Sequence, residues 1–221
     1  MTGSFGPRIG ALCGVAFALL LFLGVASINV PHSVSDKELI AWWAKSGNQT
    51  SAIASMYLVA ASAVALVLFL SHLRERLNGE SGSAGNAMFA VGGAAVGLLL
   101  TSAAVRGVIA FAVKTSDEPM PGVDVLRYFP QISYALISVA LLAMGACLVL
   151  LAWAVVRAGV LPKWLAWASL ALGLITLAGT PIFAGFMIPV VLIWAVVASI
   201  AVWRVVPAPK AAAIGPTSQP A

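Results

Sequence analysis

The sequence predicts an all-α fold: a polytopic transmembrane bundle of six helices with both termini in the cytoplasm. Three observations support this fold class. The 221-residue chain is 62% hydrophobic and only 9% charged, whereas a soluble domain carries roughly 25% charged residues. Its mean hydropathy is +1.04, so lipid must surround most of it. Finally, the apolar residues form six stretches separated by polar or Gly- and Pro-containing segments, and the basic residues gather on one side of these stretches.

The bundle is expected to occupy residues 10–206, between a cytoplasmic lead (1–9) and a disordered cytoplasmic tail (207–221). About 20 apolar residues cross a hydrocarbon core of about 30 Å. On this criterion the spans are expected at about 10–30, 49–71, 87–113, 132–156, 165–178 and 183–203. The first could instead be a cleaved secretory signal ending near Ser27, but a retained helix is favoured because its apolar run is long and further spans follow.

Prolines and glycines mark the expected boundaries of the later spans. Gly179, Thr180 and Pro181 are expected to separate the fifth span from the sixth. The loop before the fourth span is expected to be non-helical up to Pro130, because proline lacks a backbone N–H and disrupts a helix interior.

The distribution of basic residues predicts the orientation. With six spans, one side carries seven Lys or Arg residues (Arg8, Arg74, Arg76, Arg157, Lys163, Arg204, Lys210), and the other carries four (Lys37, Lys45, Lys114, Arg127). The side richer in basic residues normally faces the cytoplasm. Five of the seven acidic residues lie in the loops of the opposite, outer side: Asp36, Glu38, Asp117, Glu118 and Asp124.

The first outer loop is expected to contain a short helix with tryptophans beside it. Ser35 and Glu38 have the spacing of a capping box at a helix N-terminus. Trp42 and Trp43 follow, and Trp164 and Trp203 flank later spans. Because an indole ring with one N–H donor suits the headgroup region, all four are predicted to be interfacial anchors. A ligand-binding role for Trp42 and Trp43 is the alternative.

Small and hydroxyl residues predict how the helices pack. Gly93 and Gly97 are expected to form a face that lets a neighbouring helix approach closely. A similar face is expected at Gly10 and Gly14. Ser51, Ser55 and Ser62 lie close to one face of the second span. These serines are interpreted as a seam between helices, with a polar translocation path as the alternative.

Arg106 is the one full charge inside a predicted span, and a charge near the bilayer centre costs about 2.5–3.5 kcal/mol on insertion scales. About 20 residues into its span, it is expected near the outer boundary. An ion pair with an acid of an outer loop is the favoured interpretation. A contact with an anionic ligand or a lipid headgroup is the alternative, in which Arg106 and the three serines are candidate ligand-binding residues.

Several chemistries have no support in the residues. No catalytic motif, metal-ligand spacing or cofactor motif is present, and the two histidines, His32 and His72, fall on opposite sides of the predicted membrane. The sequence also lacks a basic run with interleaved aromatics, so no nucleic-acid partner is expected. No Asp or Glu lies inside a span, which weighs against ion-coupled transport. Enzyme activity is not indicated, although it stays open.

Three short segments resemble small six-span bacterial, especially actinobacterial, membrane proteins of unknown function. They are residues 35–40 (SDKELI), 70–74 (LSHLR) and 159–165 (GVLPKWL). The resemblance implies a multi-pass protein of the bacterial inner (cell) membrane and implies no activity. The favoured function is a binding or accessory membrane protein, whose partners are membrane lipids and either another membrane protein or a second copy. The alternative is a small-molecule or lipid transporter with a cavity near Arg106.

Overall fold

The computed structural model describes residues 7–31, 34–77, 82–115, 118–159 and 161–204, and these residues contain helices and no strands. The helices are α1 (Pro7–Ala26), α2 (Asp36–Ala44), α3 (Ser46–Leu77), α4 (Gly82–Thr115), α5 (Val123–Ala158) and α6 (Lys163–Arg204). The all-α prediction is confirmed. All except α2 are long and apolar enough to cross a membrane, which indicates a membrane-embedded protein. The predicted tail at 207–221, His32 and Asp117 lie outside the described residues.

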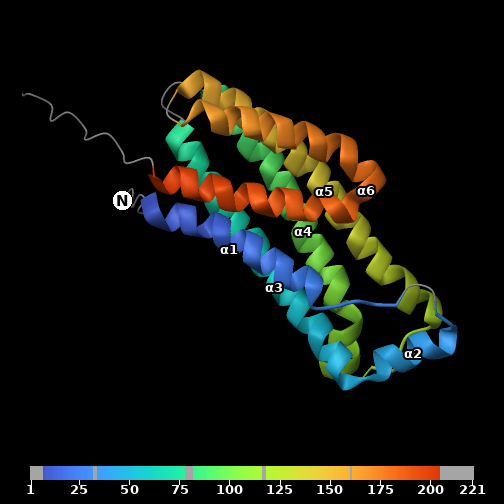
Figure 1. The fold of residues 1–221 in the computed structure, drawn as a ribbon. Coiled ribbons are helices and arrows are strands. Elements are labelled where there is room, and N and C mark those ends of the chain that lie inside the picture. Colours follow the sequence, from blue (N-terminus) through green and yellow to red (C-terminus); the bar gives the residue numbers. More distant parts are fainter. Residues whose placement is uncertain (1–6, 32–33, 78–81, 116–117, 160, 205–221) are drawn as a thin grey trace, which may run out of the picture.

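The five long helices form a closed ring, in the order α1, α3, α4, α5, α6 and back to α1 (Figure 1). Each helix packs mainly on its two neighbours in this ring. The short helix α2 lies at one end of the bundle, against α3 and α5. We call this the α2 end; the first residues of α1 and both ends of α6 lie at the opposite end (Figure 1).

Helix α6 folds back on itself. Its 42 residues would be about 63 Å long if straight, about twice the hydrocarbon core. The backbone of Phe183 is non-helical (φ −139°, ψ 50°). The indole N–H of Trp194 donates to the Ser169 hydroxyl at 3.0 Å, although 25 residues separate them. The two halves of α6 therefore lie side by side, as Figure 1 shows, and the chain reverses close to the predicted break at 179–181.

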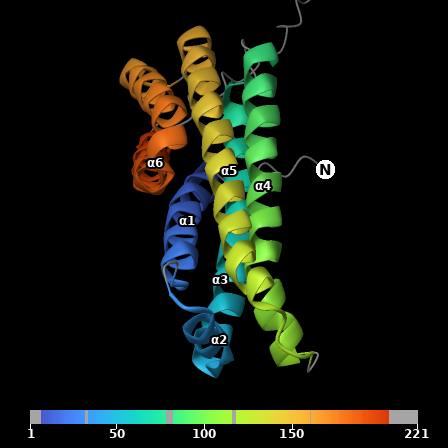
Figure 2. The same ribbon diagram turned by 90° about the vertical axis from the view of Figure 1, so that its right-hand side faces the viewer.

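Helices α3, α4 and α5 extend past the end of α1 toward α2 (Figures 1 and 2). They contain 32, 34 and 36 residues, against 20 in α1. Helix α4 begins at Gly82, five residues before the predicted span. The predicted non-helical loop up to Pro130 is wrong, because α5 begins at Val123 and contains Pro130. One missing N–H removes one hydrogen bond, and the packing of α5 on α4 and α6 outweighs that loss.

The capping box at the start of α2 is confirmed. The Ser35 hydroxyl accepts from the backbone N–H of Glu38 at 3.4 Å, and the Glu38 carboxylate accepts from the backbone N–H of Ser35 at 3.0 Å. These hydrogen bonds stabilise the ionised carboxylate and lower the pKa of Glu38 below its ordinary value. A second connection holds α2 to α5, since Arg127 and Asp36 form an ion pair at 2.6 Å.

The predicted packing face at Gly93 and Gly97 is wrong within this chain. Both residues are exposed, and a Cβ atom added to either would meet nothing within 4 Å. The neighbouring Gly92 instead faces the bundle, where an added Cβ would contact Leu70 of α3. Because adjacent helical residues lie about 100° apart around the axis, a shift of one position moves a residue from the lipid side to the core.

Other glycines do allow close helix contacts. The face at Gly10 and Gly14 is confirmed: a Cβ atom on Gly10 would collide with His72, and one on Gly14 with Ser199. At the crossing of α5 and α6, a Cβ atom on Gly173 would lie 2.8 Å from the Gly145 carbonyl oxygen. The glycine signal thus predicts close packing, but the helix face that uses it is set by the neighbours.

Candidate functional site

Arg106 extends from α4 across the inside of the bundle toward the end of α1. Its Nη1 donates to the Gly24 carbonyl oxygen at 3.2 Å and to the Ser55 hydroxyl at 3.0 Å, and its Nε donates to the Ser133 hydroxyl at 3.4 Å. These partners come from α1, α3 and α5, so one side chain connects four helices.

The contact with Gly24 follows from the way α1 ends. The last four carbonyls of a helix have no partner within it and carry partial negative charge. Gly24 lies in the last turn of α1, and its carbonyl accepts from both Arg106 and the Ser55 hydroxyl, the latter at 2.5 Å. Gly24 also packs closely, since an added Cβ would lie 2.8 Å from a methyl of Val59. Arg106 therefore caps α1 while α3 approaches at the same point.

Two buried serines hold Arg106 in place from the side of α5. Ser102 lies one turn before Arg106 on α4, and its hydroxyl donates to the Ser133 carbonyl at 2.8 Å. The Ser133 hydroxyl lies 2.9 Å from the Ser102 hydroxyl and 3.1 Å from its carbonyl. Both side chains are fully buried. This reciprocal pair joins α4 to α5 and presents the Ser133 oxygen to Arg106.

The predicted ion pair of Arg106 is not formed with any acid in the described part of the chain. Arg106 has no carboxylate within 4.0 Å there, and Asp36 pairs instead with Arg127. The reason is depth: α4 continues for nine residues beyond Arg106, about 14 Å. The outer-loop acids lie near the helix ends, whereas Arg106 lies near the level of the last turn of α1. The favoured interpretation from the sequence was therefore wrong for every described acid.

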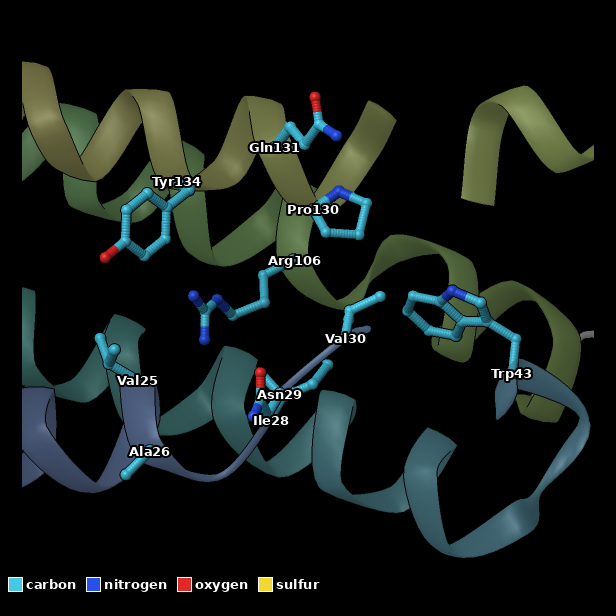
Figure 3. Close-up of a pocket in the computed structure, with 10 residues that line it drawn as sticks. All are labelled: Val25, Ala26, Ile28, Asn29, Val30, Trp43, Arg106, Pro130, Gln131 and Tyr134. Carbon is cyan, nitrogen blue, oxygen red and sulfur yellow. The ribbon is translucent and has the colours of Figure 1, made fainter. Parts of the chain in front are cut away.

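A cavity of about 520 Å³ lies beside Arg106 (Figure 3). It is bounded by the end of α1 and the segment after it, by α2, by α4 and by the first part of α5. Its lining residues are Val25, Ala26, Ile28, Asn29, Val30, Trp43, Arg106, Pro130, Gln131 and Tyr134. Figure 3 shows Arg106 between Tyr134 and Val25, with Trp43 at the other end of the cavity. In the part of the chain that the structure describes, the lining thus contains one cation, no carboxylate and mostly apolar side chains.

Three N–H donors on two lining residues have no partner among the described residues. The Nε and Nη1 groups of Arg106 use three of its five N–H donors, and the two on Nη2 donate to no described residue. Trp43 is 1% exposed, and its Nε1–H also lacks a partner, but this atom is buried and out of reach of a ligand in the cavity. The cavity therefore offers the two Nη2 donors of Arg106, in a positive environment, to a ligand.

The three serines predicted to bind a ligand lie in different environments in the structure. Ser55 belongs to the site through Arg106 and Gly24. Ser62 does not, because its hydroxyl donates to the Val59 carbonyl of its own helix at 2.7 Å. Ser51 is half-buried and lies one turn before Ser55, toward the α2 end, outside the cavity lining. The three serines therefore do not form one polar path.

The four tryptophans that were predicted to be interfacial anchors also differ, in how deeply each is buried. Trp164 and Trp203 are 51% and 46% exposed, as interfacial anchors would be. Trp43 was wrongly predicted to be an anchor, since it is buried among Leu39, Ile109 and other apolar residues. Trp42 is half-buried against the Trp43 ring at 5.1 Å between centroids. The α2 helix turns Trp43 inward, because the extended ends of α3, α4 and α5 provide a second apolar core there.

The sequence interpretation did not include Gly24, Ser102, Ser133 and Tyr134. Ser102 carried a usable signal, since it precedes Arg106 by four residues and so lies on the same helix face. The Gly24 carbonyl carried no sequence signal, because every residue has a backbone carbonyl. Ser133 and Tyr134 were expected to start a span, and only the course of α5 brings them beside α4.

The described residues contain no group of three or more His, Cys, Asp or Glu side chains that could hold a metal ion. No known family matches this sequence, and no curated protein or solved structure shows significant similarity to it. The functional interpretation therefore depends on the geometry at Arg106.

Proposed function

We propose that this chain is a membrane protein that binds an anionic ligand in the cavity beside Arg106. The observation that supports the proposal most directly is the cavity lining, with a guanidinium that keeps two N–H donors without a described partner and has no described carboxylate within 4.0 Å. Guanidinium groups bind carboxylate and phosphate oxygens through charge-assisted hydrogen bonds, which are stronger than those between neutral groups.

The proposal includes the topology: six spans, both termini in the cytoplasm, and the α2 end outside. The fold-back of α6 supports two crossings within that helix, at 20 residues before Phe183 and 22 from it onward. The basic residues support the orientation: of the seven predicted on the cytoplasmic side, the six in described residues lie at the end opposite α2, and the other four lie at the α2 end. The resemblance to six-span bacterial proteins extends the proposal to the bacterial inner membrane. In this orientation the cavity lies near the outer boundary of the bilayer.

Binding is favoured over transport because the cavity does not continue through the bundle. On the side of Arg106 away from α2, the ring is filled by buried apolar side chains, among them Leu66, Leu99, Ile137 and Leu141. Ser62, the hydroxyl expected further along a polar path, is bonded within its own helix. A site open at one end and closed by packing at the other suits a binding or accessory protein.

The test measures anion binding to the purified full chain in a neutral detergent. The probes are inorganic phosphate, glycerol phosphate and dioctanoyl phosphatidylglycerol, and binding is followed by the rise in unfolding temperature. We expect at least one probe to stabilise the wild type and Arg127→Gln, and to bind Arg106→Gln about tenfold or more weakly. Arg127→Gln is the matched control because it removes the same charge from the outer end, away from the cavity.

Glutamine at position 106 keeps an amide that can donate to the Gly24 carbonyl, so the variant should fold. Equal responses of Arg106→Gln and Arg127→Gln would contradict the proposal, and so would the absence of any response to all three anions.

A further inference from the structure

Building on the proposed anion site, we infer that its ligand is the phosphodiester headgroup of an anionic membrane lipid, which enters sideways between α1 and α5. The inference depends on three features of the cavity: where it opens, how its charge is matched, and where its donors lie.

The cavity occupies space between α1 and α5 that neither helix fills. Helix α1 packs on α3 and α6, and α5 packs on α4 and α6. The reversal of α6 reaches the level of Tyr134, since a Cβ atom on Gly185 would lie 2.9 Å from the Tyr134 hydroxyl. Beyond that level, toward α2, the cavity separates the end of α1 from the start of α5 (Figure 3).

The surface around this opening is apolar and exposed. On α1, Phe22 and Leu23 are 56% and 50% exposed, and on α5, Ile132 and Tyr134 are 47% and 41% exposed. In a protein of this composition such residues face lipid. A lipid can therefore place its headgroup in the cavity while its acyl chains stay on this apolar surface. A soluble anion has no acyl chains, so it would gain no binding free energy from this apolar surface.

The positive charge of Arg106 matches a ligand that carries one negative charge. Among the described residues, Arg106 is the one charged residue in the lining. A phosphodiester carries a single negative charge, so its binding neutralises the guanidinium and leaves no excess. A phosphomonoester carries up to two charges near neutral pH, and its second charge would lie among apolar side chains without a partner. A zwitterionic headgroup would bring its own cation close to Arg106 with no carboxylate to receive it.

The free donors of the cavity lie on Arg106. The two free N–H groups of Nη2 can donate to the non-bridging oxygens of the phosphate, while Ser55 and Ser133 hold the guanidinium in place. Figure 3 shows Trp43 at the far end, beyond Val30, where its buried ring closes the cavity. A glycerol-type headgroup presents its phosphate oxygens to Arg106. A volume of about 520 Å³ lies in the range of small-molecule sites and suits the headgroup rather than the whole lipid.

The experiment compares three matched ligands on the full chain in neutral detergent: dioctanoyl phosphatidylglycerol, dioctanoyl phosphatidylcholine and the deacylated soluble headgroup glycerophosphoglycerol. Native mass spectrometry counts bound ligands, and unfolding temperatures give affinities. We expect phosphatidylglycerol to bind about tenfold or more tightly than either of the others, and this preference to be lost in Arg106→Gln and kept in Arg127→Gln.

One further variant keeps the test decisive if Arg106→Gln folds poorly. Ala26→Trp places a large ring at the opening, where Ala26 is exposed and lines the cavity; it should weaken phosphatidylglycerol binding while leaving the unliganded unfolding temperature close to that of the wild type.

The outcomes separate this inference from the proposed function. If glycerophosphoglycerol binds as tightly as the lipid, the ligand is a soluble anion: lateral entry is overturned and the anion site stands. If phosphatidylcholine binds as tightly as phosphatidylglycerol, selection by net charge is overturned. If none of the anions binds, both the inference and the proposed function are wrong.

Discussion

At the scale of single residues, Arg106 is held by hydroxyl and carbonyl oxygens instead of a carboxylate. A neutral set of acceptors satisfies three of its N–H donors without cancelling its charge. Lysine would reach the same region as a single point charge, whereas the planar guanidinium contacts α1, α3 and α5 at once. The charge that remains distinguishes this arrangement from a structural ion pair, and it is the basis of the proposed anion site.

A second residue-scale feature predicts a pH dependence. The pKa of Glu38 is lowered by hydrogen bonds from Ser35, so the cap of α2 is most stable when the carboxylate is ionised. This stabilisation is present above the ordinary pKa of Glu, about 4.3, and is lost as the pH falls through the lower folded value. We expect Ser35→Ala to raise the pKa of Glu38, measured by NMR titration of its labelled carboxyl group. The backbone N–H at position 35 remains in this variant, so an unchanged pKa would show that the Ser35 hydroxyl does not bond to the Glu38 carboxylate in solution.

At the scale of helices, the crossing of α5 and α6 depends on two glycines in backbone contact. The carbonyl of Gly145 faces Gly173, and no side chain separates the two helices there. Such close approach improves van der Waals packing, which drives helix association where surrounding lipid is as apolar as the side chains. Helix α6 also contributes the Trp194–Ser169 hydrogen bond between its own halves. Together these contacts place the α6 reversal beside Tyr134.

This crossing predicts opposite effects for two Gly→Ala substitutions. Gly173→Ala would place a Cβ 2.8 Å from a backbone oxygen that cannot rotate away, and we expect destabilisation of about 1–3 kcal/mol. Gly93→Ala meets no atom within 4 Å and should be neutral or stabilising by up to about 1 kcal/mol through helix propensity. Unfolding in mixed micelles measures both. Similar losses for the two variants would mean that Gly93 is buried in an assembly of several copies.

At the scale of the whole molecule, the two ends of the ring differ. The α2 end carries a second apolar core of Val30, Leu39, Trp43, Ala52, Ile109, Ala110 and Leu126, beneath a short capped helix. The opposite end has exposed tryptophans and a cation–π contact of Arg157 on Trp153 at 4.5 Å. The cavity lies at the level where the ring of five helices ends and only α3, α4 and α5 continue toward α2. In the proposed topology, this is the level at which a lipid headgroup would enter between α1 and α5.

The proposed six-span topology predicts where fusion reporters become active. Reporters placed after Leu77 and after Arg204 should report the cytoplasm, and one inserted near Gly122 should report the outside, because the positive end is retained inside. Alkaline phosphatase and a fluorescent protein provide complementary readouts. A reporter after Arg204 that is active outside would give an odd number of crossings and contradict the fold-back of α6 as two spans.

The sequence by itself determined the helical class, the apolar segments, the break at residues 179–181, the α2 capping box and the presence of one charge, Arg106, inside a long apolar helix. These follow from local properties: hydropathy over about 20 residues, turn residues, capping pairs and an isolated charge. It also indicated that Ser55 faces a neighbouring helix.

Only the tertiary structure decided which groups meet. A single position separates Gly92 from Gly93, yet one contacts α3 and the other faces outward, because burial depends on the azimuth at which neighbouring helices pack. Trp43 turned inward because longer helices supply an apolar core beyond the end of α1. Arg106 contacts the Gly24 carbonyl and no described acid. The described outer-loop acids lie farther along the bundle axis than the Arg106 side chain can reach. Local pattern determines that an element forms, whereas the contact between two elements depends on their rotation and offset, which no single segment encodes.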